Sequence, residues 1–165
     1  MGVLERGYFS ADEVWALPGC PAPEQLAGRR LPVVECGHEI PCNPCETGCP
    51  KGALTVGAPI TNLPRIDPDL CDGCGNCMID CPGLAIFIVD RSRDDGLAEL
   101  WLPHEFPPLP AVGDEVAVCD RAGAVVGRGS VTRVRTGKRL DRTAIVHVLV
   151  PDELAMVVRG LEVEA

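Results

Sequence analysis

The sequence predicts an α+β protein in three parts: an extended N-terminal arm over residues 1–34, a cysteine-rich unit over 35–90, and a small antiparallel β-barrel over 99–165. Three observations predict this organisation. The first part is rich in proline, eight of the ten cysteines lie in the second between Cys36 and Cys81, and short β-branched runs separated by turn residues fill the third. A length of 165 residues permits one compact domain or two small ones that share an interface.

Composition and charge describe a soluble, acidic globular chain. Hydrophobic residues make up 46% of it, charged residues 24%, and the net charge is -9. No apolar run approaches the roughly 18 residues that span a bilayer, and the N-terminal residues lack the apolar core of a secretory signal. We therefore expect a cytoplasmic protein without a membrane span, in which closely spaced cysteines bind metal more often than they pair with each other.

The arm carries a helix signal followed by prolines. Ser10 and Glu13 form a capping-box pattern, which predicts a short helix that continues to Leu17 and ends at Pro18. The prolines that follow favour an extended segment lying across a surface.

The cysteine-rich unit contains an internal repeat with an offset of 32 residues. The pattern of residues 42–50 returns in residues 74–82, and a short strand-like run follows each copy, at 53–56 and at 85–89. Two loop-and-strand units related by sequence predict two sites related by a pseudo-twofold axis.

The second copy of the repeat has a cysteine spacing that is specific for iron–sulfur clusters. Cys71, Cys74 and Cys77 follow a Cys-x2-Cys-x2-Cys pattern, and Cys81 comes after three intervening residues, before a proline. This is the run of bacterial ferredoxins, in which the first three cysteines bind one [4Fe–4S] cluster and the fourth binds the other cluster. The spacing therefore predicts a bacterial-type two-cluster ferredoxin fold, with Cys49 of the first copy as the fourth ligand of the second cluster.

The first copy departs from this pattern. Cys42, Cys45 and Cys49 fill the second, third and fourth places, whereas Glu39 stands where the first cysteine is expected. We predict that Cys36 supplies the missing ligand, with the residues between it and Cys42 forming an enlarged loop. A larger loop changes solvent exposure and hydrogen bonding, so the two clusters are expected to differ in reduction potential.

These spacings give two crossed ligand sets. Cluster one is predicted to be held by Cys36, Cys42, Cys45 and Cys81, and cluster two by Cys71, Cys74, Cys77 and Cys49. Three alternatives stay open for cluster one: Cys20 replaces Cys36, His38 replaces it, or the site holds a three-iron cluster. Zinc fits less well, because its sites commonly use two separated Cys-x2-Cys knuckles, which need neither a third cysteine nor the Cys-Pro that follows here. Disulfides are disfavoured in the cytoplasm. Cys20 and Cys119 are otherwise expected to be buried or incidental thiols.

The third part is predicted to contain only short strands, after a charged linker at 91–96. The strands are expected at 115–119, 124–126, 130–134, 143–150 and 156–163, with turns at 120–123 and 136–138. His104 and His147 are interpreted as structural residues. The glycines at 123, 127 and 129 lack the strand-then-helix context of a dinucleotide site. No catalytic residue is therefore expected.

Charge is divided unevenly between the parts. Residues 35–90 contain eight acidic and two basic residues, whereas 120–142 contain seven basic and two acidic ones. An acidic cluster domain favours docking on a basic patch of a redox partner. The basic hairpin at 120–142 is expected to face solvent or an acidic neighbour, and the lack of interleaved aromatic residues disfavours nucleic acid as a partner.

Several segments carry a family resemblance. They are 34–36, 40–46, 60–64, 81–87 and 102–110. In these segments, and from about residue 20 onward, the chain resembles the small ferredoxin-like subunits of multi-subunit flavin dehydrogenases that act on proline, hydroxyproline or sarcosine. The resemblance implies partner subunits that contain FAD or FMN, which this chain would not bind itself, and in addition a small [2Fe–2S] subunit. The enlarged first loop is expected in that family, which supports Cys36 as a ligand.

We therefore expect a non-catalytic electron-transfer subunit that relays single electrons between a partner flavoprotein and an acceptor. Two alternatives stay open. One is a structural or sensing iron–sulfur module that contacts nucleic acid through the basic hairpin, and the other is a free ferredoxin with a barrel appendage.

Overall fold

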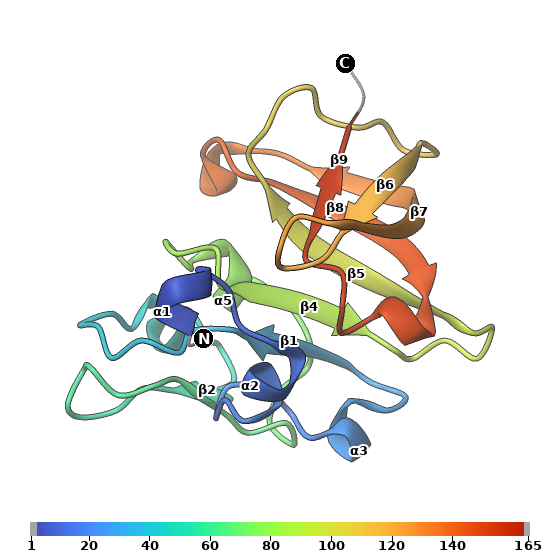
Figure 1. Cartoon of the computed structure of the whole chain (residues 1–165). Helices are drawn as coiled ribbons and strands as arrows, with labels where there is room; N and C mark the ends of the chain where they lie inside the picture. The colour runs from blue at the N-terminus through green and yellow to red at the C-terminus, as the bar shows by residue number, and fades with distance from the viewer. Residues whose placement is uncertain (1–2, 164–165) are drawn as a thin grey trace.

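The computed structural model describes residues 3–163, which are mostly strand with a few short helices (Figure 1). The helices are α1 (Val3–Arg6), α2 (Ala11–Trp15), α3 (Pro23–Leu26), α4 (Pro44–Thr47) and α5 (Asn76–Ile79), with 3-10 turns at Lys138–Leu140 and Asp152–Leu154. The strands are β1 (Arg30–Val34), β2 (Leu54–Thr55), β3 (Arg65–Ile66), β4 (Ile86–Asp90), β5 (Leu97–His104), β6 (Glu115–Cys119), β7 (Val125–Arg135), β8 (Ala144–Pro151) and β9 (Gly160–Glu162). This content agrees with the predicted α+β class.

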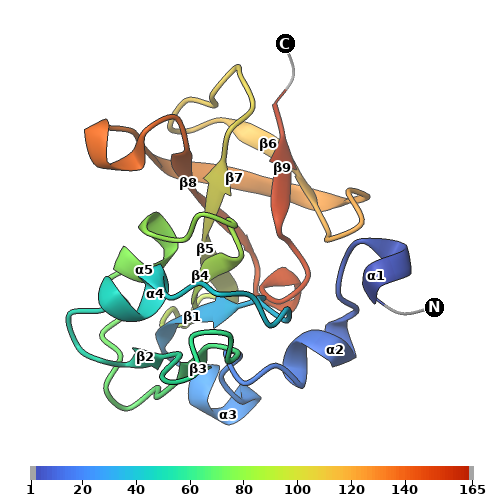
Figure 2. The same cartoon turned by 90° about the vertical axis from the view of Figure 1, so that its left-hand side faces the viewer.

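Seven strands form one sheet in the order β1-β4-β5-β8-β7-β6-β9, and β2 pairs with β3 separately. All the pairings are antiparallel. β4 and β5 run between the helices and short strands at one end of the molecule and strands β6 to β9 at the other (Figures 1 and 2). The order of hydrogen-bonded neighbours is open from β1 to β9, so a closed barrel stays a prediction.

The sheet crosses the predicted linker. β4 pairs with β5 through Ile88 with Trp101 and Val89 with Leu100. β5 in turn pairs with β8 along its whole length. One apolar core includes Leu31 of β1, the β4 and β5 residues Val89 and Leu100, and Val146 of β8. The cysteine-rich part and the C-terminal strands therefore share a sheet and a core.

The predicted extended arm needs a correction at its end. Residues 30–34 form β1, which pairs with β4 and buries all its residues except Arg30. Pro32 is tolerated because β1 is an edge strand of the sheet. Before β1, the predicted capping box is confirmed, since the Ser10 N–H donates to the Glu13 carboxylate at 2.7 Å and the Ser10 hydroxyl accepts from the Glu13 N–H at 3.4 Å.

The internal repeat is visible in the backbone. α4 and α5 differ by 32 residues along their whole length. Leu54 of β2 pairs with Ile66 of β3, and Val34 of β1 pairs with Ile86 of β4. Ile86 lies 32 positions after Leu54, and Ile66 lies 32 positions after Val34, so the two residue pairs correspond. The two copies therefore build two similar strand pairs. In each copy a short helix that carries a cysteine precedes one strand of the pair, α4 before β2 and α5 before β4.

None of the helices in the described part of the chain, residues 3–163, is long and apolar enough to cross a membrane.

Candidate iron–sulfur site

The eight predicted ligands lie on the loops and short helices of the repeat. Cys45 belongs to α4 and Cys77 to α5, and both are buried. The other six lie outside helices and strands: Cys36, Cys42, Cys49, Cys71, Cys74 and Cys81. None of the ten cysteines, all of which lie in the described part of the chain, forms a disulfide.

The first predicted set is brought together. Burial raises the pKa of the Cys36 thiol, and the charges of Cys81 and Cys42 raise it further. Burial also raises the pKa of Cys45, to about 11, with added contributions from Cys81, Cys42 and Cys36. Cys45 belongs to one cluster of buried side chains, and Cys36 and Cys81 pack against that cluster.

The second predicted set is brought together in the same way. Burial raises the pKa of Cys77 strongly, and the charges of Cys71, Cys74 and Cys49 add to it. The pKa of Cys71 is raised by burial and by the charges of Cys49 and Cys74. The same four cysteines line one cavity, together with Lys51, Ala53 and Gly73. Cys49 thus lies with the cysteines of the second copy, although it belongs to the first.

Backbone N–H groups point at several of these sulfurs. The Ala53 N–H donates to Cys49 Sγ at 3.3 Å, and the Gly73 N–H donates to Cys71 Sγ at 3.4 Å. Burial raises the pKa of Cys49, but N–H groups of residues 51–54 outweigh this effect and leave the pKa below its usual value. Such donors stabilise a thiolate and tune the potential of an iron–sulfur cluster.

Two glycines let the loop that carries Cys71, Cys74 and Cys77 lie close to the sheet. Gly73 and Gly75 have φ values of 68° and 81°, in the left-handed region. A Cβ at Gly75 would lie 2.8 Å from the Trp101 ring, and one at Gly73 would lie 2.5 Å from the Arg30 carbonyl oxygen. These positions need glycine both for conformation and for space.

The alternative ligands for cluster one lie elsewhere or act differently. The Cys20 thiol has its pKa raised to about 11 by burial, and its charged neighbours are Arg159, Glu35 and Arg121 rather than cysteines. The His38 backbone N–H donates to Cys36, and the His38 ring lies against Phe9 with the ring centroids 6.1 Å apart. Cys119, the other stray cysteine, is buried in β6.

The histidines and the basic hairpin have structural contacts. His104 is 7% exposed and His147 3% exposed. His147 stacks on Trp101 at 4.4 Å, and its Nδ1 lies 3.4 Å from the Glu99 carboxylate. In the hairpin, Arg139 bonds to Asp80 at 3.2 Å, next to Cys81. Part of the basic charge is therefore paired within the chain.

One charged network has no local signature in the sequence. Glu35, directly before Cys36, bonds to Arg121 and Arg159, which lie 86 and 124 residues further along the chain. No local pattern predicts contacts over such separations.

The chemistry of the predicted ligands fits an iron–sulfur cluster. Each predicted ligand set has four thiols, and backbone N–H groups face the sulfurs. Among the described residues, no group of three or more His, Cys, Asp or Glu side chains is close enough to hold a single metal ion.

Comparison with known proteins supports the iron–sulfur assignment. A family model described as a 4Fe-4S binding domain matches residues 63–86, which include Cys71, Cys74, Cys77 and Cys81. The chain therefore contains a ferredoxin-type iron–sulfur domain, a metal-binding domain of the electron-transport kind. No solved structure matches the chain.

Three curated relatives match parts of the chain. The ferredoxin-type protein NapF of Haemophilus influenzae is 32% identical over 60 residues, 35% of this chain and 34% of that protein. One component of the Na(+)-translocating ferredoxin:NAD(+) oxidoreductase complex of Acetobacterium woodii is 32% identical over 50 residues, 30% of this chain and 14% of that protein. The isethionate sulfite-lyase activating enzyme of Desulfovibrio desulfuricans is 34% identical over 70 residues, 42% of this chain and 20% of that protein. The chain thus spans about a third or less of the length of these relatives.

Proposed function

We propose that this chain is a non-catalytic electron-transfer subunit that holds two [4Fe–4S] clusters. Cluster one would be bound by Cys36, Cys42, Cys45 and Cys81, and cluster two by Cys71, Cys74, Cys77 and Cys49. The observation that supports the proposal most is that Cys49 of the first copy lines one cavity with Cys71, Cys74 and Cys77 of the second copy, as the crossed ligand scheme requires.

In this proposal the cysteines and the residues around them have four roles. A bound cluster would supply reversible one-electron chemistry. The thiolates hold the irons, and the buried positions of Cys45 and Cys77 keep water away from them. Backbone N–H groups, such as those of Ala53 and Gly73, stabilise the sulfur charge. The short helices α4 and α5 contact each other and so fix the spacing of the two sites.

The relatives and the family resemblance both suggest which partner proteins this chain binds. One relative is named as part of an oxidoreductase complex and another as a ferredoxin-type protein. We infer that this chain also serves a complex, in the cytoplasm, with flavin-containing dehydrogenase subunits that bind FAD or FMN and with a small [2Fe–2S] subunit. The substrate class would be a secondary amine or imino acid such as proline.

The test is purification of the native complex under anaerobic conditions with an affinity tag on this chain. We expect a flavoprotein to copurify and the clusters to be bleached reversibly when its amine substrate is added. If the chain purifies alone, and its clusters are reduced by dithionite but by no flavoprotein, it would be a free ferredoxin and not a subunit of a flavin dehydrogenase. Redox-silent clusters in a chain that retards nucleic acid would contradict electron transfer altogether.

A further inference from the structure

A group of basic side chains without acidic partners lies at the end of β7 and in the loop that follows it. The group, which we call the basic face, consists of Arg133, Arg135, Lys138 and Arg142. Arg135 is half-buried, and the other three are exposed. Within the described residues 3–163, none of these four side chains forms an ion pair or a hydrogen bond. Their charges stay together although the whole chain has a net charge of -9.

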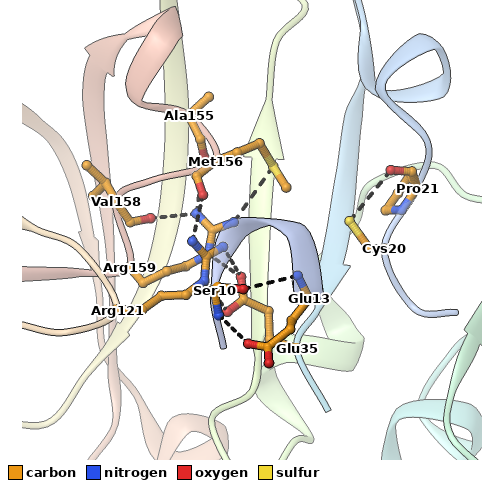
Figure 3. Close-up of polar contacts among 10 residues, drawn as sticks. All are labelled: Ser10, Glu13, Cys20, Pro21, Glu35, Arg121, Ala155, Met156, Val158 and Arg159. Carbon is orange, nitrogen blue, oxygen red and sulfur yellow. Dashed lines mark hydrogen bonds and ion pairs between the residues drawn. The ribbon is translucent and has the colours of Figure 1, made fainter. Parts of the chain in front are cut away.

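Most other basic residues in the described chain have an acidic partner. The buried Arg121 and Arg159 both donate to the Glu35 carboxylate, from their Nε atoms at 2.7 and 2.6 Å (Figure 3). Outside the basic face, Arg65 and Arg128 are the described basic residues without such a partner. The other pairs include Arg29 with Asp69, Arg30 with Asp90, Lys51 with Asp72, and Arg139 with Asp80. Unpaired positive charge is therefore concentrated at one end of β7.

Strand pairing places the basic face on a defined side of the sheet. Arg133 of β7 lies opposite His147 of β8, and His147 lies opposite Trp101 of β5. Residues that lie opposite each other in neighbouring strands share a face of the sheet, as do residues two positions apart in one strand. Arg133 and Arg135 therefore share a face with Trp101.

Trp101 connects this face to the loop 71–77, which carries three of the predicted ligands of cluster two. The guanidinium carbon of Arg135 lies 6.0 Å from the centroid of the Trp101 ring. On the loop side, a Cβ added at Gly75 would lie 2.8 Å from the same ring. Trp101 also belongs to the buried cluster that contains Cys77. The basic face therefore lies next to this loop.

The loop after β7 makes a second contact with the site, through α5. Arg139 donates from Nη1 to Asn76 Oδ1 and from Nη2 to the Asp80 carboxylate, both at 3.2 Å. Leu140 packs against the buried cluster that contains Cys77. Figures 1 and 2 both show this loop, in orange, above the green helix α5. Two separate contacts thus hold the basic face beside the predicted site.

Acidic side chains near the basic face do not neutralise it. Asp90 pairs with Arg30, and Asp80 with Arg139. Residues 133–142 contain five basic residues and a single acidic one, Asp141. Two further acids bond to uncharged groups, Glu99 to the Trp101 and Thr132 side chains and Glu105 to the Thr143 hydroxyl. Positive charge therefore prevails over the basic face.

We propose that the basic face is the docking surface for the acidic surface of a redox protein that exchanges electrons with this chain. Opposite charges steer and orient such an encounter and raise its rate. Docking here brings the partner's redox centre beside the loop 71–77, so that cluster two exchanges electrons with it. Nucleic acid fits this face less well, because Trp101 is only 8% exposed and offers no ring on which a base could stack. The inference rests on the electron-transfer function proposed above.

The test measures electron transfer from the reduced whole chain to acceptors of opposite charge, by stopped-flow absorption in about 0.1 M salt. The acceptors are an acidic blue-copper protein and a basic cytochrome c. The double variant Arg133→Glu/Lys138→Glu reverses two exposed charges of the basic face. We expect the rate with the acidic acceptor to fall by about tenfold or more and the rate with the basic acceptor to rise. Both changes should shrink in about 1 M salt, where charges are screened within a few ångströms.

Arg65→Glu/Arg128→Glu is the matched control, because it reverses two exposed charges that also lack an acidic partner. Arg128 lies five residues before Arg133 in β7, roughly 17 Å away along an extended strand. Arg65 belongs to β3, which is not part of the seven-stranded sheet. Since charges are screened over about 10 Å in 0.1 M salt, the control should leave both rates nearly unchanged.

Carbodiimide cross-linking locates the contact, because it joins lysine amines to carboxylates and the chain has only two lysines, Lys51 and Lys138. We expect the acidic blue-copper protein to be linked to Lys138 and not to Lys51, which pairs with Asp72. Lys138→Arg keeps the charge and removes the amine. It should therefore abolish the cross-link and leave the rate with the acidic acceptor unchanged.

Equal effects of the two double variants would overturn this inference, because the net charge and not the basic face would then set the rates. Rates that stay unchanged in Arg133→Glu/Lys138→Glu, or a cross-link at Lys51, would also overturn it. So would a DNA duplex that binds the wild type but not this variant, with both rates unchanged. Neutral benzoquinone should oxidise all variants at the wild-type rate, which shows that their clusters are intact. A reduced wild-type chain that passes electrons to none of these acceptors would instead contradict the proposed function.

Discussion

Cys36 is the ligand that most needs a test in the proposed cluster one, because it lies six positions before Cys42 instead of three. The cysteines that raise its pKa are nevertheless Cys81 and Cys42, two of the three other members of its predicted set. Cys20 instead faces Glu35 and the arginines.

We expect Cys36→Ser to lower the iron content by up to about four atoms per chain, because a cluster with three thiolates loses a ligand. Cys20→Ser and Cys119→Ser are the matched controls and should keep the wild-type content. Iron analysis of the three anaerobically purified variants checks this. A loss of iron in Cys20→Ser, with none in Cys36→Ser, would mean that Cys20 is the ligand.

Gly75 is the second residue with a specific consequence. Gly75→Ala forces a side chain into a backbone conformation with φ of 81° and into the Trp101 ring. We expect a loss of about 1–3 kcal/mol in the free energy of unfolding and a loss of cluster two in preference to cluster one. Denaturant titration and EPR measure the two effects.

Gly28→Ala is the control for that variant. Gly28 has a similar φ of 68°, but a Cβ there meets nothing within 4 Å. Gly28→Ala should lower the free energy of unfolding by only about 1 kcal/mol and leave both clusters intact. Equal effects of the two alanines on cluster two would contradict the role of the Trp101 contact.

At the scale of elements, β5 connects the iron–sulfur part to the C-terminal strands. Its Glu99 bonds to Trp101 Nε1 at 2.9 Å and to the Thr132 hydroxyl at 2.7 Å, and it faces His147. These contacts lower the pKa of Glu99 to about 2, although partial burial raises it. The hydrogen bond with His147 makes the largest contribution.

A carboxyl whose pKa is depressed by folding stabilises the protein above its unfolded pKa and loses this effect as the pH falls through the folded pKa. For Glu99 the stabilisation is therefore lost as the pH falls from the ordinary pKa of 4.5 to the folded pKa of about 2. At pH 7, Glu99→Gln should lower the free energy of unfolding by about 1–2 kcal/mol, allowing for partial solvent screening. The difference from wild type should shrink toward pH 2.

Denaturant titrations at several pH values measure this difference, with the exposed Glu153→Gln as the control. Glu153→Gln should differ little from wild type at any pH. A Glu99→Gln difference that stays constant from pH 7 to pH 3 would show that the carboxylate charge does not matter.

The elements differ in how well the sequence predicts them. β6 is predicted at its observed bounds, because Val116, Ala117 and Val118 form a β-branched and apolar run before a turn. The runs at 124–126 and 130–134 are one strand, β7, in which glycines interrupt the pattern. β1 and β5 are not predicted, since each contains a proline and β5 begins next to a charged linker.

The candidate site shows the same limit. Cysteine spacing predicts the two sets because the ligands within each run are local. The Glu35 network depends on strands that meet only in the folded sheet, so no spacing reveals it.

At the scale of the whole molecule, the continuous sheet predicts cooperative unfolding. The Trp101 side chain of β5 lies in the same buried cluster as Cys45 and Cys77. We expect the visible absorption of the clusters and the far-UV circular dichroism of the strands to disappear at the same temperature, because neither part keeps its core without the other. Cluster absorption that is lost well below the melting of the strands would show two independent units.

The central claim is that this one chain binds two [4Fe–4S] clusters through crossed ligand sets. It is tested most directly by iron and acid-labile sulfide analysis of the anaerobically purified wild-type chain, combined with EPR of the reduced protein. We expect about eight irons and eight sulfides per chain, with the interacting signals of two nearby clusters. About four irons with a single isolated signal would contradict it, because the Cys36 loop would then hold no cluster.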